Sequence, residues 1–226
     1  MMRRVVHFYR TSVGKKIIMA GTGVIMYLWL IGHMIGNLKA FQGREHINAY
    51  AEGLRTVGGP FFGKGQLLWL ERAVMLAAVV LHVIAALQLW LLARAARPVG
   101  YQKPPHLELS YASRTLRWGG VLIFLYVGYH LMHLTLGTVH PDFVAGDVYH
   151  NLVVGFQAWP VALFYIVAVG AVAFHLYHGV WSSFQTLGLN HPRYNRYRRP
   201  VAAVIAVGLF LGFVSVPVAV LAGVLR

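Results

Sequence analysis

Histidine is the residue type in this chain whose number and positions most clearly suggest chemistry. The 226 residues include 12 histidines and no cysteine. The missing cysteines exclude disulfide frameworks, thiolate-held iron–sulfur clusters, Cys-rich zinc sites and a C-x-x-C-H haem attachment. Any single histidine in an apolar stretch can be explained as a neutral ring bonded to a backbone carbonyl. Ionisable residues at membrane depth are nevertheless rare and usually mark a pathway, a relay or a ligand, and six histidines fall in such stretches: His33, His82, His130, His133, His175 and His178.

The elements that must position these histidines are membrane-spanning helices. The chain is 58% hydrophobic and only 12% charged, with a mean hydropathy of +0.60, which excludes an ordinary soluble domain. About 20 apolar residues cross a hydrocarbon core of roughly 30 Å, and five gaps between charges are long enough. We therefore expect an all-α integral membrane protein, residues 1–226 forming one membrane domain, in which five transmembrane helices make a bundle around these histidines: 15–39, 69–94, 114–138, 159–187 and 200–225.

The orientation of the bundle follows from the positions of Lys and Arg. The chain has 20 of them against 6 acidic residues, a formal charge of +14. Five basic residues precede or open the first span, five lie between the second and third, and four between the fourth and fifth. Cytoplasmic loops carry such an excess, so the N-terminus is expected in the cytoplasm and the C-terminus outside. Topology and contact with the lipid bilayer then explain the positive charge without nucleic acid.

The polar connections between spans give two further expectations. The segment 43–58 is too polar to span and predicts a short interfacial helix, ended by the Gly-Gly-Pro that follows. The inner loop 98–113 contains two adjacent prolines and is expected to be extended. The first span is too long for a removed signal peptide.

Height along the spans sorts four of the histidines into two pairs. Measured from the cytoplasmic end at 1.5 Å per residue, His33 and His130 lie about 27 and 24 Å up their spans, and His82 and His175 about 22 and 18 Å. Each pair comes from two different helices. A six-coordinate haem iron held between two helices needs one imidazole on each side of the porphyrin. A zinc or di-iron site would instead bring three or four ligands to one point, commonly with carboxylates.

The remaining two in-span histidines form doublets with members of these pairs. His133 and His178 each lie three residues after another histidine, and so on roughly the same helix face. Periodicity does not say which member of a doublet binds iron. The second member could contact a haem propionate or a quinone, or satisfy a carbonyl.

Four short motifs occur in order, one on each of the first four spans. They are GHMIGNL at 32–38, LWLER at 68–72, YHLMHLT at 129–135 and FHLYHGVWS at 174–182. With them, the chain resembles the cytochrome b membrane-anchor subunit of succinate dehydrogenases and fumarate reductases, the succinate:quinone oxidoreductases. The form it resembles is the single-chain, five-helix, di-haem type, and the resemblance covers nearly the whole chain.

This resemblance implies two haem b groups, each with two histidine ligands. It assigns His33 and His130 to the outer, distal haem and His82 and His175 to the inner, proximal haem, and it prefers the first histidine of each doublet. The implied function is electron transfer between an iron–sulfur subunit and menaquinone, or another quinone, as part of respiratory complex II. The chain would not carry out the dicarboxylate chemistry itself. That chemistry belongs to a flavoprotein subunit with covalent FAD, docked with the iron–sulfur subunit on the cytoplasmic face of a bacterial or archaeal cytoplasmic membrane.

A quinone site needs a polar group that handles protons beside an apolar slot for the ring. Glu71, next to Arg72 at the outer edge of the second span, is one candidate. Its alternative role is an ion pair with Arg72 or an anchor at headgroup level. A site on the cytoplasmic side, using Ser12, Lys16 or Trp181, is equally open.

Two other functions remain open. The first is the cytochrome b subunit of another membrane oxidoreductase, such as a hydrogenase or formate dehydrogenase, which would dock a different enzyme. The second is a haem-free transporter or anchor whose histidines form a proton relay. The sequence also leaves open the direction of electron flow, the quinone type and whether whole complexes form higher oligomers.

Overall fold

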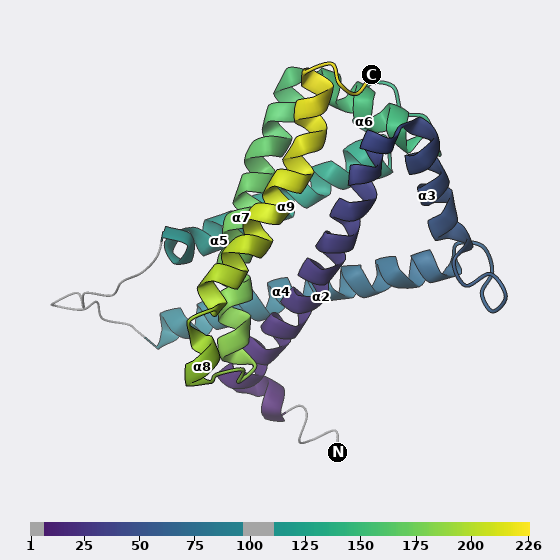
Figure 1. Cartoon of the computed structure of the whole chain (residues 1–226). Coiled ribbons are helices and arrows are strands. Elements are labelled where there is room, and N and C mark those ends of the chain that lie inside the picture. Colours follow the sequence, from purple (N-terminus) through teal and green to yellow (C-terminus); the bar gives the residue numbers. More distant parts are fainter. Residues whose placement is uncertain (1–6, 97–110) are drawn as a thin grey trace.

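Helices make up every regular element in the part of the chain that the computed structural model describes, residues 7–96 and 111–226 (Figure 1). The long helices are α2 (Ser12–Leu38), α4 (Gln66–Ala95), α5 (Tyr111–His130), α7 (Trp159–Thr186) and α9 (Arg198–Leu221). The shorter elements are the 3₁₀ turn η1 (Lys39–Gln42), α3 (Arg44–Thr56), the π-helical turn η2 (Leu131–Thr135), α6 (Val148–Gln157) and α8 (Pro192–Asn195).

Four helical segments are long and apolar enough to cross a membrane: Ser12–Gln42, Gln66–Ala95, Trp159–Thr186 and Pro192–Leu221. They match four of the five predicted spans, so the chain has the character of a multi-pass membrane protein. Helix α5 with η2 covers most of the predicted span 114–138 but is not among these four, and the fifth span remains a prediction. Of the loop expected at 98–113, residues 98–110 lie outside the described part, and α5 begins at Tyr111.

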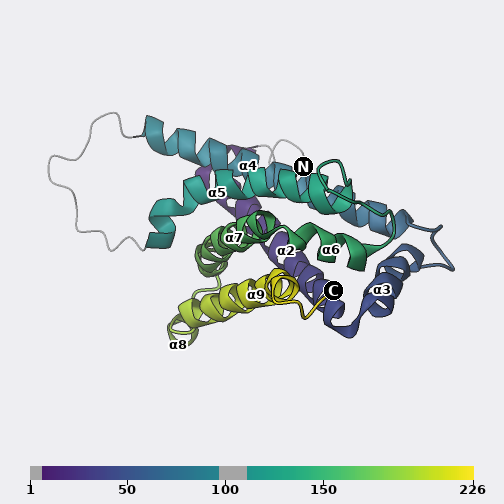
Figure 2. The same cartoon turned by 90° about the horizontal axis from the view of Figure 1, so that it is seen from above.

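The long helices pack as a chain of neighbours. Helices α7 and α9 lie side by side, α2 lies against both, α4 packs on α2, and α5 packs on α7. Figures 1 and 2 show α4 crossing α2 at one side of this group. Within the described residues, neither α2 and α5 nor α4 and α7 pack closely along their lengths. Contact between the two helices of each of these pairs is therefore limited.

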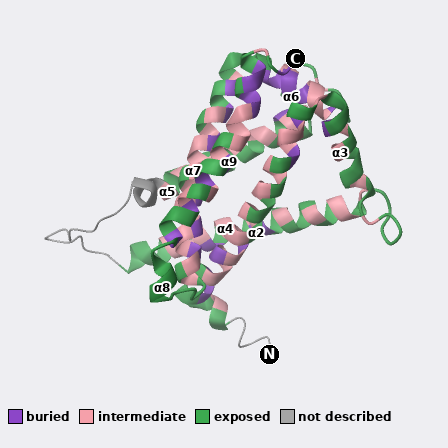
Figure 3. Cartoon of the chain, viewed as in Figure 1, coloured by how far each residue is buried: buried purple, intermediate pink, exposed green. Residues whose placement is uncertain are grey.

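The core has two apolar clusters (Figure 3). One lies where α3, α6, α7 and α9 meet and includes Phe156, Tyr165 and Val216. The other lies between α7 and α9 around Val180 and Leu209, with α2 packed against it. By contrast, α4 and α5 expose large apolar side chains such as Leu76 at 66% and Trp118 at 76%. A membrane helix facing lipid does not need to bury such side chains, so this exposure suits a bilayer.

Helix α6 lies in the connection between the third and fourth predicted spans, where no helix was expected. In the structure the Asp147 side chain caps α6 by accepting from the His150 N–H at 3.1 Å, which satisfies one of the free donors of the first turn. Leu152 and Phe156 are then buried against α7 and α9.

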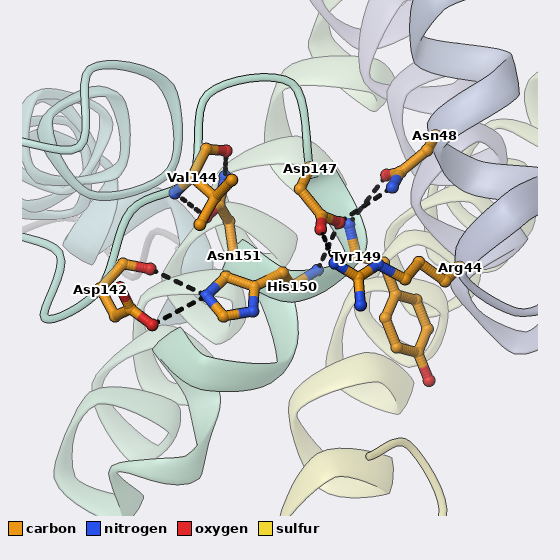
Figure 4. A network of polar contacts seen from close by, with 8 residues as sticks. All are labelled: Arg44, Asn48, Asp142, Val144, Asp147, Tyr149, His150 and Asn151. Atoms are coloured by element: carbon orange, nitrogen blue, oxygen red, sulfur yellow. Dashed lines mark hydrogen bonds and ion pairs between the residues drawn. The ribbon is translucent and has the colours of Figure 1, made fainter.

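A polar clasp joins α6 to α3 (Figure 4). Asp147 forms an ion pair with Arg44 and accepts a 2.8 Å hydrogen bond from the Asn48 amide. The Asn48 carbonyl oxygen accepts from the Tyr149 N–H at 3.1 Å. Burial raises the pKa of Asp147, but the hydrogen bonds from Asn48, the His150 N–H and Arg44 outweigh it and hold this pKa below its usual value. The predicted helix at 43–58 is present as α3, and this clasp fixes it over one end of the bundle.

Candidate functional site

The structure brings four of the in-span histidines together as two pairs. His33 on α2 and His130 on α5 have ring centroids 6.0 Å apart. His82 on α4 and His175 on α7 have ring centroids 6.2 Å apart. Each pair joins two helices that otherwise pack little against each other. We call His33 and His130 the α6-end pair, and His82 and His175 the α8-end pair.

The spacing of the rings matches what one shared metal ion requires. Two metal–imidazole bonds of about 2 Å, with roughly 1.2 Å from each ligating nitrogen to its ring centre, separate the centroids by about 6 Å. Direct hydrogen bonding between two imidazoles within a pair is not found among the described residues. Each pair therefore has the separation that an iron between the two rings needs.

The two pairs lie at clearly different levels. His82 contacts Met19 and Thr22 on α2, and His33 is 11 residues beyond Thr22 on the same helix, a rise of about 16 Å. Counting 1.5 Å per residue along each span gave a smaller difference in height between the two pairs, because it assumed that every helix runs straight across the membrane. Helix α4 instead crosses α2 (Figure 1), so distance along α4 does not measure height in the bundle.

Aromatic rings surround the α6-end pair. The Trp29 ring stacks on His33 with centroids 4.6 Å apart and planes 13° apart. Phe213 of α9 also contacts His33 at 5.8 Å, while Tyr126 and Tyr165 contact His130 at 5.9 and 6.0 Å. The Nδ1 atom of His130 is buried without a hydrogen-bond partner. In the described structure, contacts with aromatic rings therefore orient His33 and His130, and hydrogen bonds do not.

Main-chain and hydroxyl oxygens surround one member of the α8-end pair. The Nδ1 atom of His82 lies 3.0 Å from the Met19 carbonyl oxygen and 3.2 Å from the Thr22 hydroxyl. A Cβ on Gly23 would lie 3.5 Å from the His82 ring, so α2 approaches this ring closely. The Nδ1 atom of His175, in contrast, is buried without a partner.

These features fit a b-type haem at each pair. An unpaired buried nitrogen is costly unless a ligand or water reaches it or holds its ring, and His130 and His175 each have one. The donor set is two imidazoles per site, which is the set of a six-coordinate electron-transfer haem. Four histidines would hold the two groups: His33, His82, His130 and His175.

His133 does not share the surroundings of His130. Its ring is 1% exposed, its Nδ1 lies 3.0 Å from the Tyr165 hydroxyl, and it stacks on His140 with centroids 4.9 Å apart. The turn from Leu131 to Thr135 is π-helical, closed by a bond from the Leu136 N–H to the Leu131 carbonyl. This wider turn rotates His133 away from the face of His130 that an α-helical spacing predicts.

His178 lies between the α8-end pair and the end of α7. Its Nδ1 atom is buried without a partner, and its ring packs edge-on against Trp181 at 5.5 Å. The Arg199 guanidinium packs over the Trp181 ring, 5.1 Å from its centroid. The other predicted contacts on this side, Ser12 and Lys16, are exposed, and no contact in the described part joins them to Trp181.

Glu71 lies in an apolar cavity beside the α6-end pair. Its Oε1 atom is buried without a partner. Its alternative role as an ion-pair partner of Arg72 is not seen in the described structure, because the Arg72 guanidinium packs over the Trp69 ring at 4.9 Å. Trp29, which stacks on His33, lines the same cavity of about 330 Å³, whose other walls are Ile25, Leu67, Leu70, Val74 and Met75.

Searches for relatives identify no family for this chain: no protein-family model matches it, and no curated protein or solved structure does either.

Proposed function

We propose that this chain is a membrane-anchoring, di-haem cytochrome b subunit that passes electrons between an iron–sulfur subunit and a quinone, in a complex of the succinate:quinone oxidoreductase class. The observation that carries the proposal is the presence of two histidine pairs, each bridging two helices at a spacing of about 6 Å that suits two axial ligands.

The residues of the chain have distinct roles in this proposal. His33 and His130 hold one haem, and His82 and His175 hold the other. When bound, the two haems supply one-electron transfer, for which fully ligated iron with no open position is suited. The levels of the pairs give a stepwise route along α2, because they are separated by about 16 Å along that helix.

Glu71 and Trp29 define the quinone site that we propose. The cavity is apolar, as a quinone ring requires, and contains one carboxylate oxygen without a partner. A quinol that is oxidised loses two electrons and two protons, and Glu71 can accept a hydrogen bond or a proton from one of its hydroxyls. The stacked Trp29 and His33 rings place this cavity next to the α6-end pair.

Helix α5 would be the fifth span, with the α8 end of the bundle in the cytoplasm. Arg193, Arg196 and Arg199 are exposed at that end, and the sequence has no acidic residue after Asp147. Such a basic face satisfies the positive-inside rule. It also offers a surface to the soluble flavoprotein and iron–sulfur subunits.

Purification of the tagged chain with its native partners tests the proposal. We expect a flavoprotein with covalent FAD and an iron–sulfur protein to co-purify, and succinate to reduce b-type haem in the complex. A molybdenum or nickel enzyme as the partner would assign the chain to another membrane oxidoreductase. Purified chain without haem absorbance would eliminate the cytochrome function altogether.

A further inference from the structure

The hydrogen bonds of Thr22 determine which nitrogen of His82 carries the proton. The Thr22 hydroxyl lies 2.7 Å from the Ile18 carbonyl oxygen, one turn back on α2, and 3.1 Å from that of Met19. A hydroxyl has one hydrogen to donate, and these carbonyls take it. Toward His82, 3.2 Å away, the Thr22 oxygen can therefore only accept.

Both neighbours of His82 Nδ1 are then acceptors. The Met19 carbonyl oxygen, 3.0 Å from Nδ1, has no hydrogen to give, and the Thr22 hydroxyl has used its own. Nδ1 must carry the ring proton, which is shared between two oxygens of α2. In a neutral imidazole the other nitrogen, Nε2, then has the free lone pair that a metal needs.

We propose that Thr22 is a positioning residue for the α8-end pair: with the Met19 carbonyl it fixes the Nδ1–H tautomer of His82 and strengthens His82 as an iron ligand. This inference rests on the proposed function, because it assigns a role toward haem. Outer hydrogen bonds of this kind orient a ligating histidine and raise its basicity. A more basic axial ligand stabilises ferric over ferrous iron, so it lowers the reduction potential of the haem it holds.

Among the proposed ligands in the described part of the chain, Thr22 contacts only His82. The Nδ1 atom, which is bonded in His82, is buried without a partner in His130 and His175, and His175 is bonded instead to the backbone of Leu116 on α5. Thr22 is itself only 8% exposed, so water does not readily take the place of its hydroxyl. Removal of the hydroxyl should therefore affect one haem and leave the other unchanged.

Redox titration of the haems in the intact complex tests the inference with Thr22→Val, which keeps the side-chain shape and removes the acceptor. We expect the reduction potential of the α8-end haem to rise and the affinity of that site for haem to fall by about tenfold or more. The α6-end haem should stay unchanged. A His175→Ala variant, which should retain only the α6-end haem, identifies which potential is which. Thr22→Ser keeps the hydroxyl and should restore the wild-type value.

Ser183→Ala is the matched control. Ser183 is also 8% exposed and bonds back to its own helix, at 2.7 Å from the Val180 carbonyl, but it has no described contact with a histidine. The Ser183→Ala substitution should change the reduction potential of neither haem. If Thr22→Val does not insert into the membrane, Thr22→Ala against Thr22→Ser makes the same comparison.

The results separate the two proposals. A wild-type chain that binds no haem overturns the proposed function. Two haems with unchanged potentials and full occupancy in the Thr22 variants that lack the hydroxyl overturn only the role of Thr22, and so do equal shifts of both haems.

Discussion

The two histidine pairs are alike in spacing and different in what surrounds them. Ring centroids are 6.0 Å apart in the α6-end pair and 6.2 Å apart in the α8-end pair. Rings of Trp29, Tyr126, Tyr165 and Phe213 pack around the first pair, whereas the second is tied to α2 by hydrogen bonds to His82. The two haems that we propose would therefore have similar ligands in different surroundings, and they would differ in reduction potential and in stability of binding.

Substitution of a single histidine of either pair should have the largest effect. We expect His175→Ala to remove the α8-end haem and His33→Ala to remove the α6-end haem, each leaving the other in place, since the pairs lie about 16 Å apart along α2. Haem content per chain, measured optically, should fall by half in both variants. Loss of both haems, or of neither, contradicts the pairing, and His191→Ala at the exposed α8 end is the control for purification.

Disruption of the polar clasp between α3 and α6 should have the next largest effect, a loss of stability. Asp147→Ala removes the cap of α6 and leaves Arg44 and Asn48 without their acceptor, which we expect to cost about 3 kcal/mol of stability. Thermal denaturation in detergent checks this, with Asp147→Asn, which can still cap the helix, losing less. The α6-end haem should be released before the α8-end haem. Release in the opposite order would argue against a cover over that pair.

Close packing around Gly155 at the α6 end predicts a smaller loss of stability when this glycine is replaced. A Cβ on Gly155 would lie 2.8 Å from His133 Cε1 and 3.1 Å from His140 Nε2, too close for side chains that are already packed. Gly155→Ala should therefore destabilise the chain by about 2 kcal/mol. The same thermal measurement would contradict this packing if the variant were as stable as wild type.

Acid should weaken the clasp in a defined range of pH. The pKa of Asp147 is lowered in the folded chain, so its contribution is fully present above its unfolded pKa of about 3.9 and is lost as the pH falls through the folded pKa. The stability of wild type should drop toward that of Asp147→Asn below about pH 4. Equal pH dependence in the two proteins would show that Asp147 is not the group that titrates.

Substitution of Gly23, the glycine that lies against a histidine of the α8-end pair, should have almost no effect on stability. A Cβ on Gly23 would lie 3.5 Å from His82, an ordinary contact, and alanine favours a helix interior by less than about 1 kcal/mol. Gly23→Ala should be as stable as wild type or slightly more so. A loss as large as that of Gly155→Ala would mean that the two ends do not differ in packing.

The long helices could be predicted because each one depends on the residues of a single continuous stretch of sequence. Apolar stretches between charges locate α2, α4, α7 and α9 to within a few residues. Helix α6 was missed because its signal is short: Asp147 as a cap, followed by Leu152 and Phe156 at helical spacing. That pattern is present in the sequence but is too short to stand out beside the long apolar spans.

The surroundings of the histidines could not be predicted in the same way. His82 meets Met19 and Thr22 because α4 crosses α2 at that point, and no periodicity within either helix specifies a crossing. His133 faces Tyr165 and His140 because the helix widens to a π turn after His130. Height along the spans and the family resemblance suggested the pairs, whereas their neighbours follow from the tertiary packing.

The haem content and spectrum of the purified wild-type chain test the assignment of two haems to the histidine pairs. We expect two b-type haems per chain, both low-spin with two histidine ligands, in reduced-minus-oxidised absorbance and electron paramagnetic resonance spectra. A purified, folded chain that contains no haem, or a single haem unaffected by replacement of either His33 or His175, would contradict it.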